Sequence, residues 1–224
     1  MSMESTEQDV EKIGTYFSEM SHVFLEEYKN KGLKKHTKII LDFFKDKDLS
    51  DDVVVELGCG VGGLLYKFLE LGAKNSYGID LSESMIENAK ELAKALNFKE
   101  KTNFFIGDFN SLSKGVLPIN QADVVVADRV LCCSPVPLEI LQSMINFKPK
   151  YLIVVQPRKN ILSKLYMALR IWLRHLRYKV KHHDQETPYM PVKEYDKLCE
   201  DNNYKRVLQK FRYGWEIVIY QKNK

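Results

Sequence analysis

The sequence predicts an α/β fold with a doubly wound, mostly parallel sheet and helices on both of its faces. Three observations support this. Short β-branched segments alternate with helix-length amphipathic segments through the middle of the chain. A glycine-rich loop follows the first of these strands, within Val53–Gly63. Acidic residues stand at the ends of successive strands. Such alternation is typical of parallel strands joined by right-handed helical crossovers.

The elements follow in order. The pattern from Lys12 to Phe44 is helical, and Gly32 is expected to separate two helices. Apolar runs then predict strands at 53–57, 75–79, 103–106, 122–127 and 151–155. The helices between them are expected at 64–71, 82–96 and 137–145.

The last third of the chain breaks this alternation. Residues 158–179 form a long basic and apolar helical pattern with no strand directly after it, and 192–202 is helical again. The segments 204–211 and 215–221 are predicted strands, with Gly214 at their junction. We expect a terminal hairpin that adds an antiparallel edge to the sheet.

Composition limits the possible functions. The chain has 224 residues, of which 45% are hydrophobic and 29% charged, as in soluble globular proteins. The acidic, polar N-terminus is unlike a signal or transit peptide, and no apolar run reaches the ~20 residues of a spanning helix. The four cysteines lack metal-ligand spacing, so we expect reduced thiols, a cytoplasmic location and no metal site. A net charge of +4 gives little electrostatic footprint for nucleic acid.

The glycine loop is ambiguous by itself. Glycines 58, 60 and 62 allow a sharp turn and a close approach of a ligand to the backbone, but glycines 58, 60 and 63 also satisfy a dinucleotide-binding pattern. Glu56, inside the curve of the loop, would repel a pyrophosphate and suits a ligand with ammonium and sulfonium groups. Asp80, at the end of the second strand, can accept hydrogen bonds from ribose hydroxyls. Asp108, after the third strand, can accept one from the exocyclic amine of adenine. The acids therefore favour a cationic nucleoside.

These residues carry a family resemblance. Glu56-Leu-Gly-Cys-Gly-Val-Gly62, Ile79-Asp80, Gly107-Asp108-Phe109 and Asp128 resemble the class I S-adenosylmethionine-dependent methyltransferases, most strongly over residues 50–157. The resemblance implies a Rossmann-like, seven-stranded, mostly parallel sheet with an antiparallel last strand, a helical N-terminal lid, and a helical insertion between strands 5 and 6. It implies a single methyltransferase domain over 1–224. Its parts would be a lid (1–50), a cofactor-binding core (51–157), a substrate-cap insertion (158–203) and the hairpin (204–224).

The resemblance also implies S-adenosyl-L-methionine as the cofactor. Its methionine end would lie near Glu56, Gly58 and Gly60, its ribose on Asp80, its adenine near Asp108 and Phe109, and its methyl group near Asp128 and Arg129. Tyr16 would either contact the methionine carboxylate or pack in the core. The predicted cofactor-binding residues are Tyr16, Glu56, Gly58, Cys59, Gly60, Gly62, Asp80, Leu81, Asp108, Phe109, Asp128 and Arg129.

A looser resemblance concerns the acceptor. Asp128-Arg-Val-Leu-Cys-Cys-Ser-Pro135, with Gln156-Pro-Arg158 and the basic helix after it, is similar to small-molecule methyltransferases related to the magnesium-protoporphyrin O-methyltransferases. Ser134 stands where that family usually has tyrosine, so the porphyrin substrate is not carried over. We expect methyl transfer to a small molecule through an oxygen, nitrogen, sulfur or carbon atom. The alternatives are an NAD(P)-dependent oxidoreductase and a non-catalytic S-adenosylmethionine-binding protein.

Two questions stay open in the sequence. If the acceptor must lose a proton, the candidate catalytic bases are His175, His182, His183 and Tyr189. The segment 158–179 is a lid over the acceptor, a peripheral membrane contact or an ordinary amphipathic helix. Nucleic acid is not an expected partner, because Asp128-Arg-Val-Leu stands where a base-flipping Asn-Pro-Pro-Tyr motif would follow strand 4.

Overall fold

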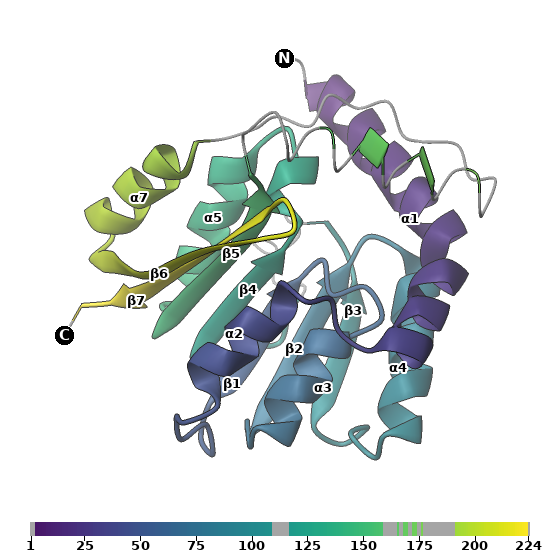
Figure 1. Ribbon diagram of the computed structural model, residues 1–224, viewed down its shortest axis with the longest axis horizontal. Helices are drawn as coiled ribbons and strands as arrows, with labels where there is room; N and C mark the ends of the chain where they lie inside the picture. Colours follow the sequence, from purple (N-terminus) through teal and green to yellow (C-terminus); the bar gives the residue numbers. More distant parts are fainter. Residues whose placement is uncertain are drawn as a thin grey trace.

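The computed structural model describes residues 3–108, 117–158 and 191–223, together with 165, 168–169, 172–173 and 176. Its strands form one seven-stranded sheet in the order β3-β2-β1-β4-β5-β7-β6 (Figure 1). The strands are β1 (Val53–Leu57), β2 (Asn75–Asp80), β3 (Thr102–Ile106), β4 (Val124–Asp128), β5 (Tyr151–Pro157), β6 (Tyr204–Arg212) and β7 (Trp215–Lys222).

The first five strands are parallel, whereas β7 runs antiparallel to both β5 and β6. This confirms the predicted fold class. The hairpin forms the antiparallel edge of the sheet, as expected, and within it β7 lies between β5 and β6. Its side chains from Trp215 to Tyr220 are buried, while most of those of β6 are exposed. Burial therefore decides which strand of the hairpin is internal.

Helices cover both faces of the sheet and create two hydrophobic cores. On one face lie α2 (Thr37–Phe44), α3 (Gly63–Glu70) and α4 (Glu83–Ala95), and on the other lie α5 (Pro137–Asn146) and α7 (Val192–Asp201) (Figure 1). Alternation along β1 supplies both cores, because Val54 packs on the first face and Val55 on the second. A short 3₁₀ turn, η2 (Leu131–Cys133), follows β4.

Helix α1 (Met3–Lys31) is long and is followed directly by Gly32, whose φ is +63°. It is attached to the start of α4, because the Ser18 hydroxyl donates a hydrogen bond of 2.9 Å to Ser82 Oγ. Ser82 is the N-cap of α4 and accepts the backbone N–H of Met85. The contact holds α1 beside the loop that follows β2. No helix in the described ranges is long and apolar enough to cross a membrane.

Candidate functional site

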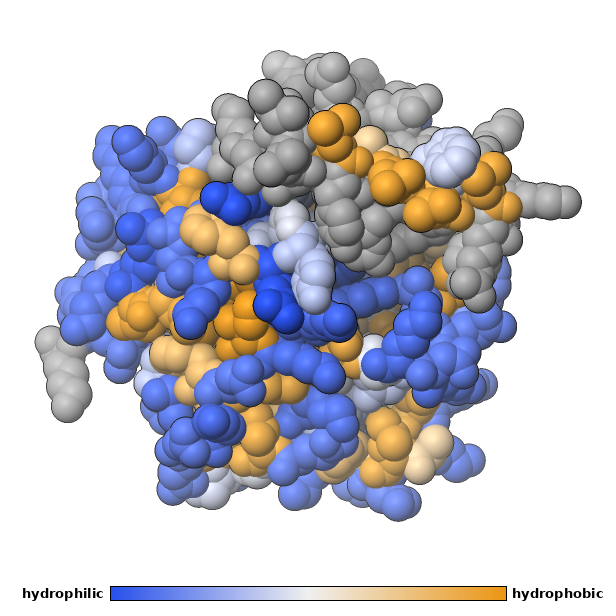
Figure 2. All heavy atoms as spheres, in the orientation of Figure 1, coloured by the Kyte–Doolittle hydropathy of each residue, from blue (hydrophilic) through white to orange (hydrophobic). Residues whose placement is uncertain are grey.

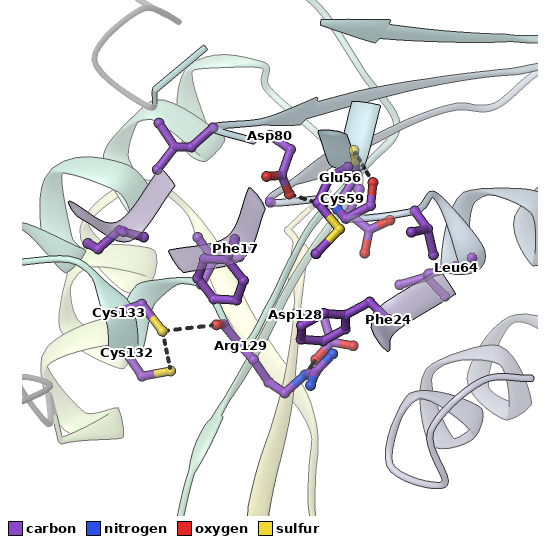
Figure 3. Close-up of a pocket in the computed structure, with 18 of the residues that line it drawn as sticks. Phe17, Phe24, Glu56, Cys59, Leu64, Asp80, Asp128, Arg129, Cys132 and Cys133 are labelled. Carbon is purple, nitrogen blue, oxygen red and sulfur yellow. Dashed lines mark hydrogen bonds and ion pairs between the residues drawn. The ribbon is translucent and has the colours of Figure 1, made fainter. Parts of the chain in front are cut away.

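A cavity of about 380 Å³ lies between α1 and the carboxyl ends of β1, β2 and β4. Strand ends of an open α/β sheet are the usual place for a ligand. Figure 3 shows Glu56, Cys59 and Asp80 on one side of the cavity, and Asp128, Arg129 and the two adjacent cysteines on another. Phe17 and Phe24, from α1, project between these groups (Figure 3).

The glycine loop after β1 forms part of the cavity wall. Gly58 and Gly60 have φ of +65° and +53°, a region that side chains disfavour. A Cβ on Gly58 would lie 2.4 Å from Val130 Cγ2, whereas among the described residues a Cβ on Gly60 would meet only Met85 Sδ, at 4.0 Å. Gly58 is therefore required for packing, and the space in front of Gly60 is open to a ligand.

Gly62 has a different role from its neighbours. It is the N-cap of α3, with a φ of +78°, and a Cβ there would lie 2.7 Å from Tyr66 Oη. It does not line the cavity. Its place in the sequence pattern is thus explained by the turn into α3 and by packing against Tyr66.

Glu56 is the least satisfied acid in the site. It is only 4% exposed, and in the part of the chain that the structure describes its Oε2 has no hydrogen-bond partner. Burial, with the nearby Asp128 charge, raises the pKa of this carboxyl well above 4.5. A cation bound in the cavity would favour the ionised form and supply the missing partner.

Asp80 joins the end of β2 to the glycine loop. Its Oδ2 accepts the backbone N–H of Gly60 at 2.8 Å, and its Oδ1 accepts that of Ser82 at 3.0 Å. Burial raises the pKa of Asp80, and the backbone donors oppose this shift. Each carboxylate oxygen has a second acceptor position, so hydroxyl donors can still bind.

Asp128, at the end of β4, is held by three side chains. It accepts hydrogen bonds from Thr37 Oγ1 at 3.0 Å and Arg129 Nε at 3.1 Å, and its Oδ1 lies 3.1 Å from His36 Nε2. Burial opposes ionisation, but Arg129 and His36 hold the pKa of Asp128 well below 3.8. Trp215 packs against two of these partners, with the His36 ring centroid at 5.5 Å and Arg129 Cζ at 5.6 Å.

Two adjacent thiols extend this wall. Cys132 Sγ and Cys133 Sγ are 3.8 Å apart, and Cys133 Sγ lies 3.6 Å from the carbonyl oxygen of Arg129 (Figure 3). The hydrogen bond between them lowers the pKa of Cys133 and raises that of Cys132. All four cysteines of the chain are free.

The structure brings most predicted cofactor residues to one cavity. Those that line it are Tyr16, Glu56, Gly58, Cys59, Gly60, Asp80, Leu81, Asp108, Asp128 and Arg129. Their individual roles remain predictions. Phe109 and the four proposed bases, His175, His182, His183 and Tyr189, lie outside the described residues.

Sequence reasoning missed several residues of the cavity wall, including His36, Thr37, Phe24 and Trp215. His36 and Thr37 lie 92 and 91 positions from Asp128, so no local spacing could link them. Phe24 and Trp215 have the ordinary pattern of core residues. In the sequence, only the acidic residue at the end of β4, Asp128, indicated that other polar side chains would bind at this position.

Comparison with known proteins identifies the family. Residues 48–217 match the model of a methyltransferase domain, which is most of the chain, and the chain belongs to this family. The fold and the family together make it a class I S-adenosylmethionine-dependent methyltransferase, as the resemblance predicted.

Curated relatives match mainly over the core. An uncharacterized protein of Methanocaldococcus jannaschii is 31% identical over 144 residues, which are 56% of this chain and 66% of that protein. A ribosomal protein L11 methyltransferase of a Psychrobacter species is 29% identical over 97 residues, 43% of this chain and 32% of that enzyme. The chain thus spans about a third of the L11 methyltransferase.

Solved structures share the fold over almost the whole chain. Magnesium protoporphyrin IX methyltransferase from Synechocystis, with bound S-adenosylhomocysteine, has a TM-score of 0.69 at 17% identity and covers 96% of this chain and 100% of its own. A putative methyltransferase from Haloferax volcanii, in complex with the activator Trm112, has a TM-score of 0.65 at 15% identity, covering 93% and 98%. At these identities the likeness concerns the fold.

Proposed function

We propose that this protein transfers the methyl group of S-adenosylmethionine to a small-molecule acceptor bound beneath α1. One observation carries the proposal: Glu56 in β1, Asp80 at the end of β2 and Asp108 just after β3 line a single cavity beside an open glycine backbone. Acids at successive strand ends suit an adenosyl ligand with two cationic groups, and they disfavour a dinucleotide pyrophosphate.

The residues present fit the cofactor. The unpartnered Oε2 of buried Glu56 would hold the ammonium group. Asp80 would accept the ribose hydroxyls while it holds Gly60, and Asp108 would accept the adenine amine. When bound, S-adenosylmethionine supplies an electrophilic methyl group on a positively charged sulfur.

The protein's own contribution is alignment and exclusion of water. Asp128, fixed by His36, Thr37 and Arg129, gives the wall beside the glycine loop a rigid polar surface. Phe17 and Phe24 place apolar rings over the cavity. Fixing an acceptor atom in line with the methyl carbon and the sulfur accelerates transfer mainly by proximity and orientation.

A small and largely apolar acceptor is the class that this cavity favours. Among its wall residues, Phe17, Phe24, Val130, Ile140 and Trp215 are apolar or aromatic, and the first two belong to α1. Pockets of a few hundred Å³ in which apolar side chains surround a set of oriented polar groups are typical small-molecule sites. The L11 methyltransferases named above indicate a protein acceptor as the competing possibility, although the match covers only part of those enzymes.

Calorimetry and isotope transfer test the proposal together. The purified chain should bind S-adenosylhomocysteine and show no heat with NADH; the reverse result would indicate an oxidoreductase. With S-adenosylmethionine labelled on its methyl group, the label should enter the low-mass fraction of a cell extract. Label in the protein or RNA fraction would exclude the small-molecule acceptor. Binding without any transfer would mark a non-catalytic binding protein.

A further inference from the structure

Five exposed apolar side chains recur at helical spacing between β5 and α7. Leu165, Leu169, Trp172, Leu173 and Leu176 are helical and 63, 54, 56, 50 and 57% exposed, respectively. Their spacing places them on one side of a helix. In Figure 2 this part of the surface shows a run of orange (hydrophobic) and pale (intermediate) side chains. We call these five residues the leucine face.

The leucine face differs from ordinary exposed apolar residues. Elsewhere in the described ranges, large exposed hydrophobic side chains such as Leu96 and Ile106 occur singly or in short runs. Five such side chains on one helical side create a continuous patch, and patches of this kind mark interaction sites. None of these five residues lines the cavity, so the patch is separate from the proposed active site.

The charge of the same segment identifies the partner. Between Arg158 and His183 the sequence has eight lysines and arginines and no aspartate or glutamate. A second copy of this segment would be repelled by that charge, whereas an anionic surface would be attracted. A helix with leucine and tryptophan on one side, in a strongly basic segment, has the pattern of helices that lie in the interface of a bilayer.

We propose that the leucine face docks this protein on a membrane surface that contains anionic lipids. The leucines and Trp172 enter the boundary between headgroups and acyl chains, and the basic residues of the segment bind lipid phosphates and carboxylates. The docking is peripheral and reversible. It does not depend on the proposed reaction, so it is tested without catalysis.

The two tryptophans of the chain make a direct test possible. Trp172 is 56% exposed and Trp215 is 9% exposed, so Trp215→Phe leaves a single fluorescent reporter on the leucine face. With vesicles of phosphatidylcholine and phosphatidylserine, the emission of Trp172 should shift to the blue, and brominated acyl chains should quench it. Phosphatidylcholine vesicles alone should give a much smaller shift, and added salt should weaken binding.

Two variants test whether the leucine face is responsible for vesicle binding. Leu169→Ser with Leu173→Ser should weaken vesicle binding by at least about tenfold, because two large apolar groups no longer enter the lipid. The matched control, Leu96→Ser, removes a 38% exposed leucine at the end of α4 and should bind as the wild type does. Circular dichroism checks that each variant is folded. Equal binding to both vesicle types would overturn the proposal, and so would binding that the Leu169→Ser, Leu173→Ser double variant leaves unchanged. So would concentration-dependent self-association that the double variant abolishes, because a second copy would then occupy the face.

Discussion

The two ends of the sheet both carry acidic residues, but their surroundings differ. At the amino end, Asp52 accepts a hydrogen bond from Lys150 at 2.6 Å, and Asp123 accepts one from the backbone N–H of Val53 at 2.9 Å. Lys150 also lies 3.2 Å from Asp123. At the carboxyl end, Glu56 has a buried oxygen without a partner in the described part of the chain, and the pKa values of Glu56 and Asp80 are raised.

We use this contrast to distinguish structural carboxylates from those that we propose bind the cofactor. The amino-end acids have opposite charges beside them and connect the starts of β1, β4 and β5. At the carboxyl end, the buried Glu56 has an oxygen without a partner in the described part of the chain. This costs stability in the free protein, and a bound cation would offset the cost. Substitutions at the two ends should therefore affect different measurements, and the following predictions test that difference.

The largest effect is expected at the glycine loop. Gly60→Val should abolish binding of S-adenosylhomocysteine in calorimetry, because a branched side chain at a φ of +53° strains the loop and fills its open side. Gly14→Ala is the control, since its Cβ would make only an ordinary contact of 3.6 Å with Leu81. If the valine variant folds and binds normally, the ligand does not approach Gly60.

Asp80→Ala should weaken cofactor binding by about tenfold to a hundredfold, because a hydrogen bond to a charged group contributes roughly 1.5–3 kcal/mol. It also releases the N–H of Gly60, which the carboxylate holds at 2.8 Å. Titration calorimetry measures the affinity, and thermal unfolding identifies any loss of fold. An unchanged affinity in a folded variant would remove Asp80 from the ribose site.

The features that depend on local sequence pattern could be predicted from the sequence. Hydrophobic runs located every strand of the sheet, and acids placed directly after strands had to meet at one edge of a parallel sheet. Contacts between residues far apart in the sequence could not be predicted in this way. His36 and Thr37 hold Asp128 across more than 90 positions, and neither residue belongs to a periodic pattern. The position of β7 inside the sheet likewise depends on pairing with β5, which alternation alone does not specify.

Glu56→Gln should weaken cofactor binding by about tenfold and make the free protein at least as stable as the wild type. The native pKa of Glu56 is above 4.5, so the folded protein retains a proton that the unfolded chain loses. This group therefore lowers stability as the pH rises above 4.5, and glutamine removes that loss. Thermal unfolding between about pH 5 and pH 8 should show a smaller decline for the variant.

Proton release on binding gives a second test of the prediction for Glu56. Ionisation of Glu56 on binding a cation should release a proton, so calorimetry of the wild type in buffers of different ionisation enthalpy should give different binding heats. The glutamine variant should show a smaller difference. Equal proton release in both proteins would assign the titrating group to another residue, with Asp80 as the next candidate because its pKa is also raised.

The smallest effect is expected at the amino end. Asp52→Asn should leave cofactor affinity unchanged and lower the free energy of unfolding by about 1 kcal/mol or less, because the Lys150 side chain is 60% exposed and solvent screens the pair. Lys150→Gln should cost a similar amount, and the double variant less than the sum of the two, since one interaction is lost in each. Denaturant unfolding gives the energies, and calorimetry gives the affinities. A large loss of cofactor affinity in Asp52→Asn would show that the two ends of the sheet are coupled, and that pairing does not distinguish structural acids from ligand-binding ones.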